Sequence, residues 1–371
     1  MEEKVSELFP ANSPIKILST RVWRQYLGGM CLDEFLSGEK GEDNHFPEDW
    51  IGSTVRAINP GRENIEEGES IVLSPIDGVS KINLRELLEQ KGVDILGEEH
   101  CKKIGKEPGI LVKLLDSAVR LAIQTHPSKE NALKYFGSKY GKTESWYILD
   151  TRTINDEKPY VYLGFKENAT KEAWREAFLN QDIDRMLSML HKLPVKKGDV
   201  FFVRYGIPHA IGPGCFVCEV QEPSDLIFKT ELKKIDGSPI SLDVATMGLG
   251  TDEMLNNFDY TGLSEEETLC AYKIEPKVIF KNEYALFTQL LGYDTTTCFS
   301  INQLDLSKGS VELQGGLFNI AIVIEGKGEV KGREKAIEIK KGDYILLPKS
   351  LDSVIWKGQD LSVIIFSPPL L

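Results

Sequence analysis

Side chains able to bind a divalent metal occur at three places along this chain. Gln124 and His126 lie two residues apart in LAIQTHPS (121–128), Glu144 follows in KTESWYIL, and His209 occurs in FFVRYGIPHAIG. Because side chains two residues apart on a strand point to the same face, Gln124 and His126 can converge on one point. Two imidazoles, a carboxylate and an amide oxygen suit a divalent metal such as zinc and leave positions open for water or substrate, as a catalytic site does.

Each histidine taken alone has a simpler explanation, because a histidine in a strand is more often a hydrogen-bonded core residue than a ligand. The chain has five histidines, and His126 and His209 both occur in strand-like segments rich in glycine, proline and aromatic residues. This shared context favours a joint role for the pair. His45, His100 and His191 occur in polar loop or helical contexts, and we expect them at the surface.

Length and composition indicate a soluble globular protein of two or three domains: the chain has 371 residues, of which 41% are hydrophobic and 27% charged. Its net charge of −13 argues against nucleic acid or an anionic membrane as a partner, because both attract basic surfaces. An anionic substrate would need a local group of basic side chains. Lys113, Lys142, Arg204 and Lys229 are the candidates for such a group.

The sequence is typical of a cytoplasmic protein. Its acidic start, MEEKVSELFPANSP, lacks the apolar run of a secretory signal, and no apolar stretch approaches the roughly 20 residues that span a membrane. Six scattered cysteines fit reduced thiols better than a disulfide framework. Cys215 and Cys218 form a lone C-F-V-C motif, but its β-branched and aromatic filling is typical of a strand, which disfavours a second zinc site or a redox role.

The pattern of apolar residues predicts a mainly β protein with helical insertions. Short apolar runs separated by glycine and proline predict strands, whereas residues 82–106 have helical spacing interrupted by glycine. Residues 170–193 have the clearest helical period, with Thr170 as the expected N-cap and Pro194 after the end. The tryptophan and methionines of its apolar stripe are expected in a core.

An internal repeat predicts two copies of one barrel. KKGDVFFV and KKGDYILL share their first four residues, and when Gly198 is aligned with Gly342, the position of His209 falls on Ser353. We therefore expect a metal-binding catalytic domain at 1–250 and a metal-free domain at 251–371, with the helical insertions at about 82–106 and 170–193.

The order of three motifs also carries a family resemblance. QTHP, then KTE followed by tryptophan, then GIPHAIG resemble the type I phosphomannose isomerases (mannose-6-phosphate isomerases), which are zinc enzymes built on the cupin barrel. The likeness takes in FPEDWIGST (46–54), ILVKLLD (110–116) and CEVQEPSDLIFK (218–229) and covers most of the first 250 residues. It implies two cupin barrels, that is, double-stranded β-helix or jelly-roll barrels, with helical insertions.

The resemblance also implies roles for individual residues. Lys229 stands where the family carries an arginine, and a lysine offers a point charge in place of a planar fork of donors. This exchange bears on activity and on substrate choice. The implied roles are zinc ligands for Gln124, His126, Glu144 and His209, with one Zn²⁺ per chain; catalysis for Lys142, Lys229, Glu219 and Asp225; and substrate binding for Lys113, Glu48 and Trp50.

By this resemblance the protein is a zinc-dependent aldose-ketose isomerase of carbohydrate metabolism. It would interconvert mannose 6-phosphate and fructose 6-phosphate, both small-molecule sugar phosphates, through an enediol(ate) intermediate. A sugar-phosphate-binding cupin with weak or different catalysis is one alternative, and a non-haem iron cupin oxygenase is another. A homodimer stays open, because the strand edges of cupin barrels commonly pair.

Overall fold

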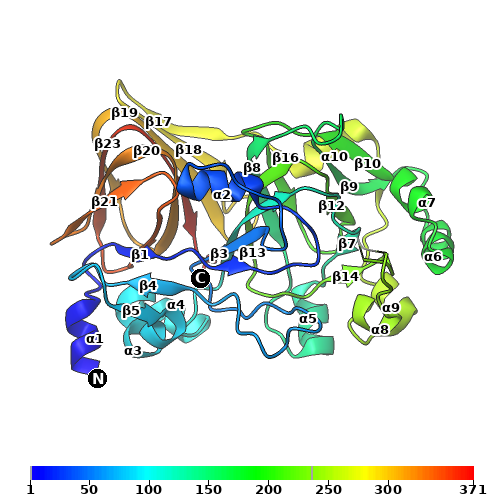
Figure 1. The fold of residues 1–371 in the computed structure, drawn as a ribbon, viewed down its shortest axis with the longest axis horizontal. Coiled ribbons are helices and arrows are strands. Elements are labelled where there is room, and N and C mark those ends of the chain that lie inside the picture. Colours follow the sequence, from blue (N-terminus) through cyan, green and yellow to red (C-terminus); the bar gives the residue numbers. More distant parts are fainter. Residues whose placement is uncertain (1, 235–236) are drawn as a thin grey trace.

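The computed structural model describes residues 2–234 and 237–371. Most of the chain is in strands, which form two halves that lie side by side along the longest axis of the molecule (Figure 1). Among the described residues every strand pairing is antiparallel except that of β15 with β9. The predicted mainly β class is confirmed.

The first half is built from two sheets whose inner faces pack together. Trp146 and Ile148 of one sheet share a buried cluster with Val161 and Leu163 of the other. The seven-stranded sheet has the order β16-β11-β8-β13-β6-β3-β2, and the six-stranded sheet runs β10-β9-β12-β7-β14 with β15 beside β9. Their bounds are β2 (Arg21–Val22), β3 (Glu48–Ile51), β6 (Leu111–Ser117), β7 (Gln124–Thr125), β8 (Glu144–Thr151), β9 (Tyr160–Lys166), β10 (Leu190–Pro194), β11 (Val200–Val203), β12 (His209–Ile211), β13 (Cys215–Gln221), β14 (Phe228–Lys229), β15 (Gly262–Leu263) and β16 (Lys273–Ile274).

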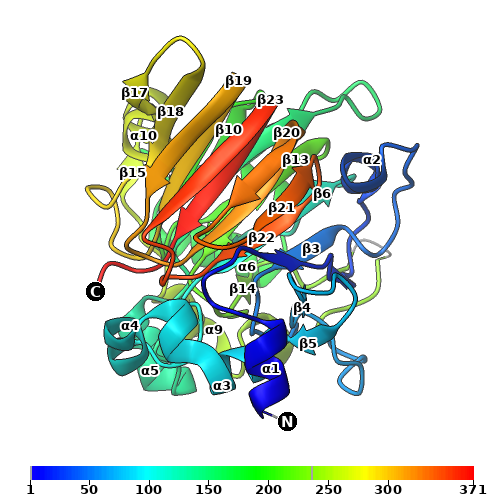
Figure 2. The same cartoon turned by 90° about the vertical axis from the view of Figure 1, so that its left-hand side faces the viewer.

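The second half is one ten-stranded sheet that closes around its own buried cluster. Its long strands β19, β23 and β20 lie side by side in Figure 2. The order is β17-β18-β19-β23-β20-β22-β1-β4-β5, with β21 beside β20. The bounds are β1 (Ile15–Ile17), β4 (Ile71–Leu73), β5 (Lys81–Asn83), β17 (Lys277–Lys281), β18 (Ala285–Leu291), β19 (Ser300–Gln314), β20 (Asn319–Lys331), β21 (Ala336–Lys340), β22 (Tyr344–Leu347) and β23 (Ser353–Ser367).

Strand pairing crosses the predicted division at residue 250 in both directions. From the N-terminal side, β1 pairs with β22 of the second half. From the C-terminal side, β15 pairs with β9 and β16 pairs with β11, both in the first half. The division itself stays a prediction.

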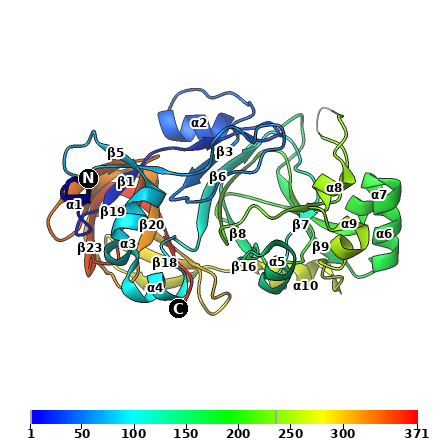
Figure 3. The ribbon, with the colours of Figure 1, turned by 90° about the horizontal axis from the view of Figure 1, so that it is seen from below.

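Helices pack around the two halves. The predicted segment 82–106 contains α3 and α4, and the segment 170–193 contains α6 and α7, which lie at the end of the first half farthest from the second (Figure 3). Thr170 caps α6 by accepting a hydrogen bond from the Ala173 amide at 3.1 Å. The expected end of the helix is wrong, because residues 190–194 form strand β10 and Pro194 belongs to it. The bounds are α1 (Glu2–Leu8), α2 (Met30–Ser37), α3 (Leu84–Leu96), α4 (Glu98–Lys103), α5 (Lys129–Phe136), α6 (Lys171–Asn180), α7 (Ile183–Ser188), α8 (Leu242–Ala245), α9 (Gly250–Leu255) and α10 (Glu265–Tyr272).

Trp174 and Met186 of this helical segment pack with Phe165 and Phe228 against the outer face of the six-stranded sheet, so their prediction as core residues is confirmed. None of the described helices is long and apolar enough to cross a membrane.

The two halves are joined by the largest buried cluster of the protein. Alternate residues of the seven-stranded sheet, such as Val112 and Leu114 of β6, pack against Ile320 and Phe366 of the second half. The residues between them on each strand, such as Lys113, point to the opposite face, toward the interior of the first half. One face of this sheet therefore secures it to the second half, and the other face is free to carry polar groups.

A buried hydrogen bond crosses the same boundary. The Tyr344 hydroxyl on β22 donates to a carboxylate oxygen of Asp49 on β3 at 2.9 Å, and both side chains are buried. Ser19 donates to the same carboxylate at 2.6 Å. Because Asp49 lies between Glu48 and Trp50, this bond fixes the strand that carries two of the predicted site residues.

We predict that Tyr344→Phe lowers the free energy of unfolding by about 1 to 3 kcal/mol, the usual cost of leaving a buried acceptor short of a donor. Tyr147→Phe is the matched control, because its hydroxyl also crosses between the halves but donates to the neutral Gln303 amide at 3.2 Å. The control should cost about 1 kcal/mol or less. Urea denaturation measures both values, and an equal loss in the two variants would contradict the importance of Asp49.

Candidate metal centre and adjoining pocket

Three buried side chains meet between the two sheets of the first half. Ligand atoms of His126, Glu144 and His209 all lie within 4.8 Å of one another. Glu144 is the first residue of β8 in the seven-stranded sheet, whereas His209 begins β12 and His126 follows β7 in the six-stranded sheet. The Nε2 atoms of both histidines are 3.3 Å from Glu144 carboxylate oxygens. The sequence spacing therefore brings together three of the four predicted ligands at one point.

Backbone carbonyls orient both imidazoles. Nδ1–H of His126 donates to the Leu226 carbonyl at 3.0 Å, and Nδ1–H of His209 donates to the Ile207 carbonyl at 2.8 Å. These bonds leave each Nε2 as the lone-pair atom that faces Glu144. Burial and the Lys142 charge lower the pKa of His126 to about 3, and burial also lowers the pKa of His209. Both rings are thus neutral near pH 7, as metal binding requires.

Gln124 completes the predicted set from the neighbouring strand. It lies directly opposite His209 in the β7–β12 pairing, and its side-chain amide is 3.2 Å from His209 Nε2. The oxygen and nitrogen of this amide exchange places by a simple flip, so either atom can face the centre.

The centre also contains a buried acceptor atom without a hydrogen bond, as expected of a cation site. Glu144 Oε1 is buried and accepts no hydrogen bond from the described residues. Its other oxygen accepts from Lys142 Nζ at 2.6 Å, and the same Nζ is 2.9 Å from His126 Nε2. Burial alone would lower the pKa of Lys142, but the attraction of Glu144 and Glu219 raises it. Two neutral imidazoles beside a carboxylate with a free oxygen fit a divalent metal.

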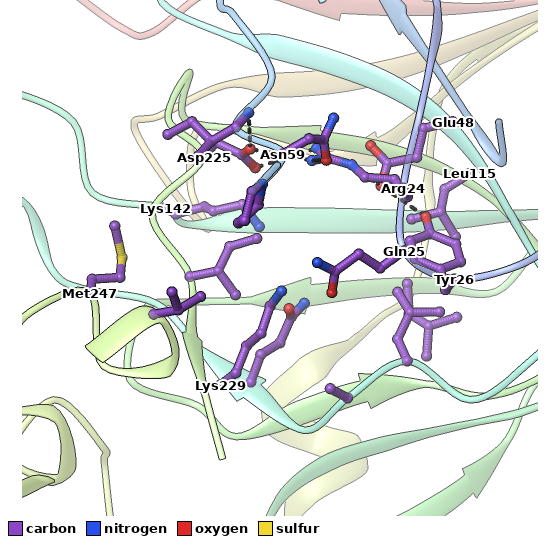
Figure 4. Close-up of a pocket in the computed structure, with 18 of the residues that line it drawn as sticks. Arg24, Gln25, Tyr26, Glu48, Asn59, Leu115, Lys142, Asp225, Lys229 and Met247 are labelled. Carbon is purple, nitrogen blue, oxygen red and sulfur yellow. Dashed lines mark hydrogen bonds and ion pairs between the residues drawn. The ribbon is translucent and has the colours of Figure 1, made fainter. Parts of the chain in front are cut away.

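A pocket of about 480 Å³ opens beside this centre, and Figure 4 shows charged side chains reaching into it from both sheets and from the loop before β3. Of the residues to which the family resemblance gives a role in catalysis or substrate binding, only Trp50 does not line it. Trp50 lies beneath Lys113, whose Nζ is 4.8 Å from the centroid of the indole ring. The predicted residues that line the pocket are Glu48, Lys113, Gln124, Lys142, Glu219, Asp225 and Lys229.

Strand register brings a row of polar side chains together on the pocket wall that the seven-stranded sheet forms. Lys113 on β6 lies opposite Glu219 on β13 and opposite Trp50 on β3. Lys113 Nζ is 3.4 Å from a Glu219 carboxylate oxygen, and both side chains are buried. Burial and the nearby Glu144 charge raise the pKa of Glu219. It is thus a carboxyl group suited to holding a proton inside the pocket.

Lys229 lies on the opposite wall, and its side-chain amine has no hydrogen bond or ion pair with any residue that the structure describes. It pairs with Gln124 in the β14–β7 register, so the two side chains enter the pocket next to each other. Burial and the nearby Arg24 charge lower the pKa of Lys229. An unpaired, half-buried amine is unusual, and it is available to an anionic ligand.

Three sequence-based expectations are wrong. Arg204 does not line the pocket, because its guanidinium pairs with Asp259. His100 and His191 are buried, where each hydrogen-bonds a backbone carbonyl; a polar sequence context did not reveal that tertiary burial.

Cys215 and Cys218 lie on strand β13, as predicted. Cys215 packs inside the first half and Cys218 packs between the halves, so the two thiols are on opposite faces of the sheet.

Sequence reasoning missed Arg24. It lines the pocket from the irregular segment after β2, where neither periodicity nor a motif marks it.

Comparisons with known proteins agree with this geometry. Residues 291–367 match the family described as mannose-6-phosphate isomerase, cupin domain. The chain is 28% identical to the mannose-6-phosphate isomerase of Streptococcus mutans over 292 residues, which is 74% of this chain and 80% of that protein. It is also 28% identical to mannose-6-phosphate isomerase ManA of Bacillus subtilis, over 71% of this chain and 78% of that protein.

The fold has matches among solved structures. The mannose 6-phosphate isomerase of Bacillus subtilis superposes with a TM-score of 0.72 at 22% identity, covering 95% of this chain and 99% of that one. The K132A mutant of phosphomannose isomerase from Salmonella typhimurium has the same TM-score, 0.72, at 16% identity, with coverage of 96% and 100%. The cupin architecture expected from the sequence is confirmed. Residues 291–367 thus match a mannose-6-phosphate isomerase cupin domain, and the chain is similar to mannose-6-phosphate isomerases in sequence and in fold.

Proposed function

We propose that the protein is a zinc-dependent aldose-ketose isomerase that interconverts mannose 6-phosphate and fructose 6-phosphate. The observation that carries the proposal is the meeting of His126, Glu144 and His209 at a pocket that also holds an unpaired lysine. The relatives named as mannose-6-phosphate isomerases support the choice of substrate.

The reaction makes three demands on the pocket. A proton must leave C2 of the sugar and return at C1, the negative charge that develops on the oxygens must be stabilised, and the phosphate must be held away from the reacting carbons. Zinc bound by His126, Glu144, His209 and Gln124 would supply a Lewis acid for the sugar oxygens.

The lysines supply positive charge at two places. Lys142, which contacts His126 and Glu144, is placed to stabilise charge on the reacting end of the sugar. Lys229, on the opposite wall and without a partner of its own, is placed to bind the phosphate. Lys113 extends the positive wall beside Glu219.

The carboxylates divide into two kinds. Although burial opposes it, the Arg24 charge holds the pKa of Asp225 down at about 2 and also lowers the pKa of Glu48. These two groups stay ionised and orient hydroxyls and cations. Glu219, whose pKa is raised by burial and by Glu144, is the carboxyl group best suited to exchange a proton with substrate or with water.

Metal binding tests the ligand set. We expect His126→Ala and Glu144→Gln to lower the affinity for zinc at least about 10- to 100-fold, because losing a direct ligand should cost no less than losing one of the groups that orient the ligands. His191→Ala is the control, because His191 is equally buried but hydrogen-bonds the Leu263 carbonyl at 2.8 Å outside the pocket. Competition with a chelator measures the affinity, and an unchanged affinity in Glu144→Gln would exclude this site.

Turnover tests the reaction. Purified protein should form fructose 6-phosphate from mannose 6-phosphate, lose this activity with a chelator and regain it when zinc is added, because the Lewis acid is removed and then restored. Metal-loaded protein without turnover would refute the isomerase. If it still bound mannose 6-phosphate, the sugar-phosphate-binding alternative would replace it.

Lys229 is expected to strengthen substrate binding at some cost in the free energy of unfolding. We expect Lys229→Met to raise KM for mannose 6-phosphate about 10- to 100-fold, the loss of a charge-assisted hydrogen bond. The free energy of unfolding should stay equal or rise, because an unpaired, half-buried cation is removed. Lys229→Arg should keep most of the binding. Lys273→Met, which breaks a 2.9 Å ion pair with Asp199 away from the pocket, is the control and should leave KM unchanged. An unchanged KM in Lys229→Met would rule out the phosphate contact.

A further inference from the structure

Arg24 is the one arginine that lines the pocket among the residues the structure describes, and its donors are directed at the wall. Its Nε donates to Glu48 at 3.0 Å, and its two terminal nitrogens each contact an Asp225 carboxylate oxygen at 3.4 Å. One of these terminal nitrogens, Nη1, also donates to the Asn59 amide oxygen at 3.3 Å. The guanidinium lies over the Trp50 ring, 5.1 Å from its centroid, and the side chain is buried.

The two carboxylates that Arg24 holds take all their hydrogen bonds from groups other than lysine. Glu48 also accepts from the Tyr26 hydroxyl at 2.8 Å and from the Trp50 indole at 2.7 Å. Asp225 also accepts from the Ile58 amide at 3.1 Å. Both carboxylates nevertheless line the same pocket as Lys113 and Lys229.

The alternative to this arrangement is a pairing of the same carboxylates with the lysines. A buried carboxylate that loses its cation must find another, because burying an unpaired charge costs more than moving a flexible side chain. The unpaired Lys229 is available as that partner, and the negative charge of Asp225 already favours the charged form of Lys229. A lysine paired in this way would be lost to an anionic substrate.

We propose that Arg24 is a positioning residue of the isomerase site: it ties Glu48 and Asp225 to the pocket wall and so keeps the neighbouring Lys229 free for the phosphate of the substrate. This role rests on the proposed isomerase function. Arginine suits it better than lysine, because one planar fork reaches two carboxylates at once whereas an ammonium group is a single point charge.

The test compares four zinc-loaded variants: Arg24→Met, Arg24→Lys, Arg24→Met combined with Asp225→Asn, and Arg152→Met. Arg152 is the matched control, since it also joins two carboxylates, Asp43 at 2.6 Å and Asp116 at 3.3 Å, but does not line the pocket. For each variant we would measure kcat and KM for mannose 6-phosphate, the inhibition constant of inorganic phosphate, and thermal stability.

We expect Arg24→Met to raise both KM and the phosphate inhibition constant about 10- to 100-fold, in proportion to the loss of one charge-assisted contact, with a much smaller change in kcat. Arg24→Lys should fall between Arg24→Met and the parent. Adding Asp225→Asn to Arg24→Met should lower KM and the inhibition constant again, because the carboxylate that captures the lysine is gone. Arg152→Met should lose stability with KM unchanged.

Three outcomes would overturn the proposal: a parental KM in Arg24→Met, a double variant that binds no better than Arg24→Met, or an equal rise in KM in Arg152→Met. If Arg24→Met does not fold, Arg24→Lys decides, and an unchanged KM there overturns the role. If the parent protein has no turnover, the isomerase function fails separately. Calorimetric titration with inorganic phosphate then tests Arg24 alone, and equal affinity in parent and Arg24→Met would overturn the proposal.

Discussion

Burial of charge is the constraint on which the rest of this structure depends. Basic and acidic side chains from both sheets enter one pocket where little water reaches them, so each must be held by a partner or await a ligand. Glu144 meets Lys142 and the two histidines, Lys113 meets Glu219, and the remaining carboxylates meet Arg24. Among the described cations that line the pocket, only Lys229 lacks such a partner, and that exception indicates where an anion binds.

Such a network needs rigid walls, and the packing of the two halves supplies them. The seven-stranded sheet is apolar on the face that meets the second half, and this contact fixes the strands that carry Lys113, Glu144 and Glu219 on the other face. The second half therefore contributes to the site without lining the pocket. Tyr344 extends the same support to β3 through its hydrogen bond to Asp49.

Features that follow a periodic pattern or belong to a motif could be predicted from the sequence. Alternation along strands put Gln124 and His126 near one point, and helical period identified α6 and its core residues. Sequence-based prediction was wrong where tertiary contacts determine the structure. Arg204 pairs with Asp259, and His100 and His191 are buried. Residues 190–194 form a strand in place of the end of a helix. Arg24 could not be predicted, because it lies in an irregular loop that has no periodic pattern of residues. Its contacts are with Glu48 and Asp225, which are far from it along the chain.

X-ray absorption at the zinc edge of the metal-loaded protein would test the ligand set beside the pocket. We predict a first shell of nitrogen and oxygen only, with the outer-shell scattering of two imidazole rings from His126 and His209, and loss of one imidazole in His209→Ala. Sulfur in the first shell would show that cysteines bind the metal, and this result would contradict the proposed chemistry of the pocket.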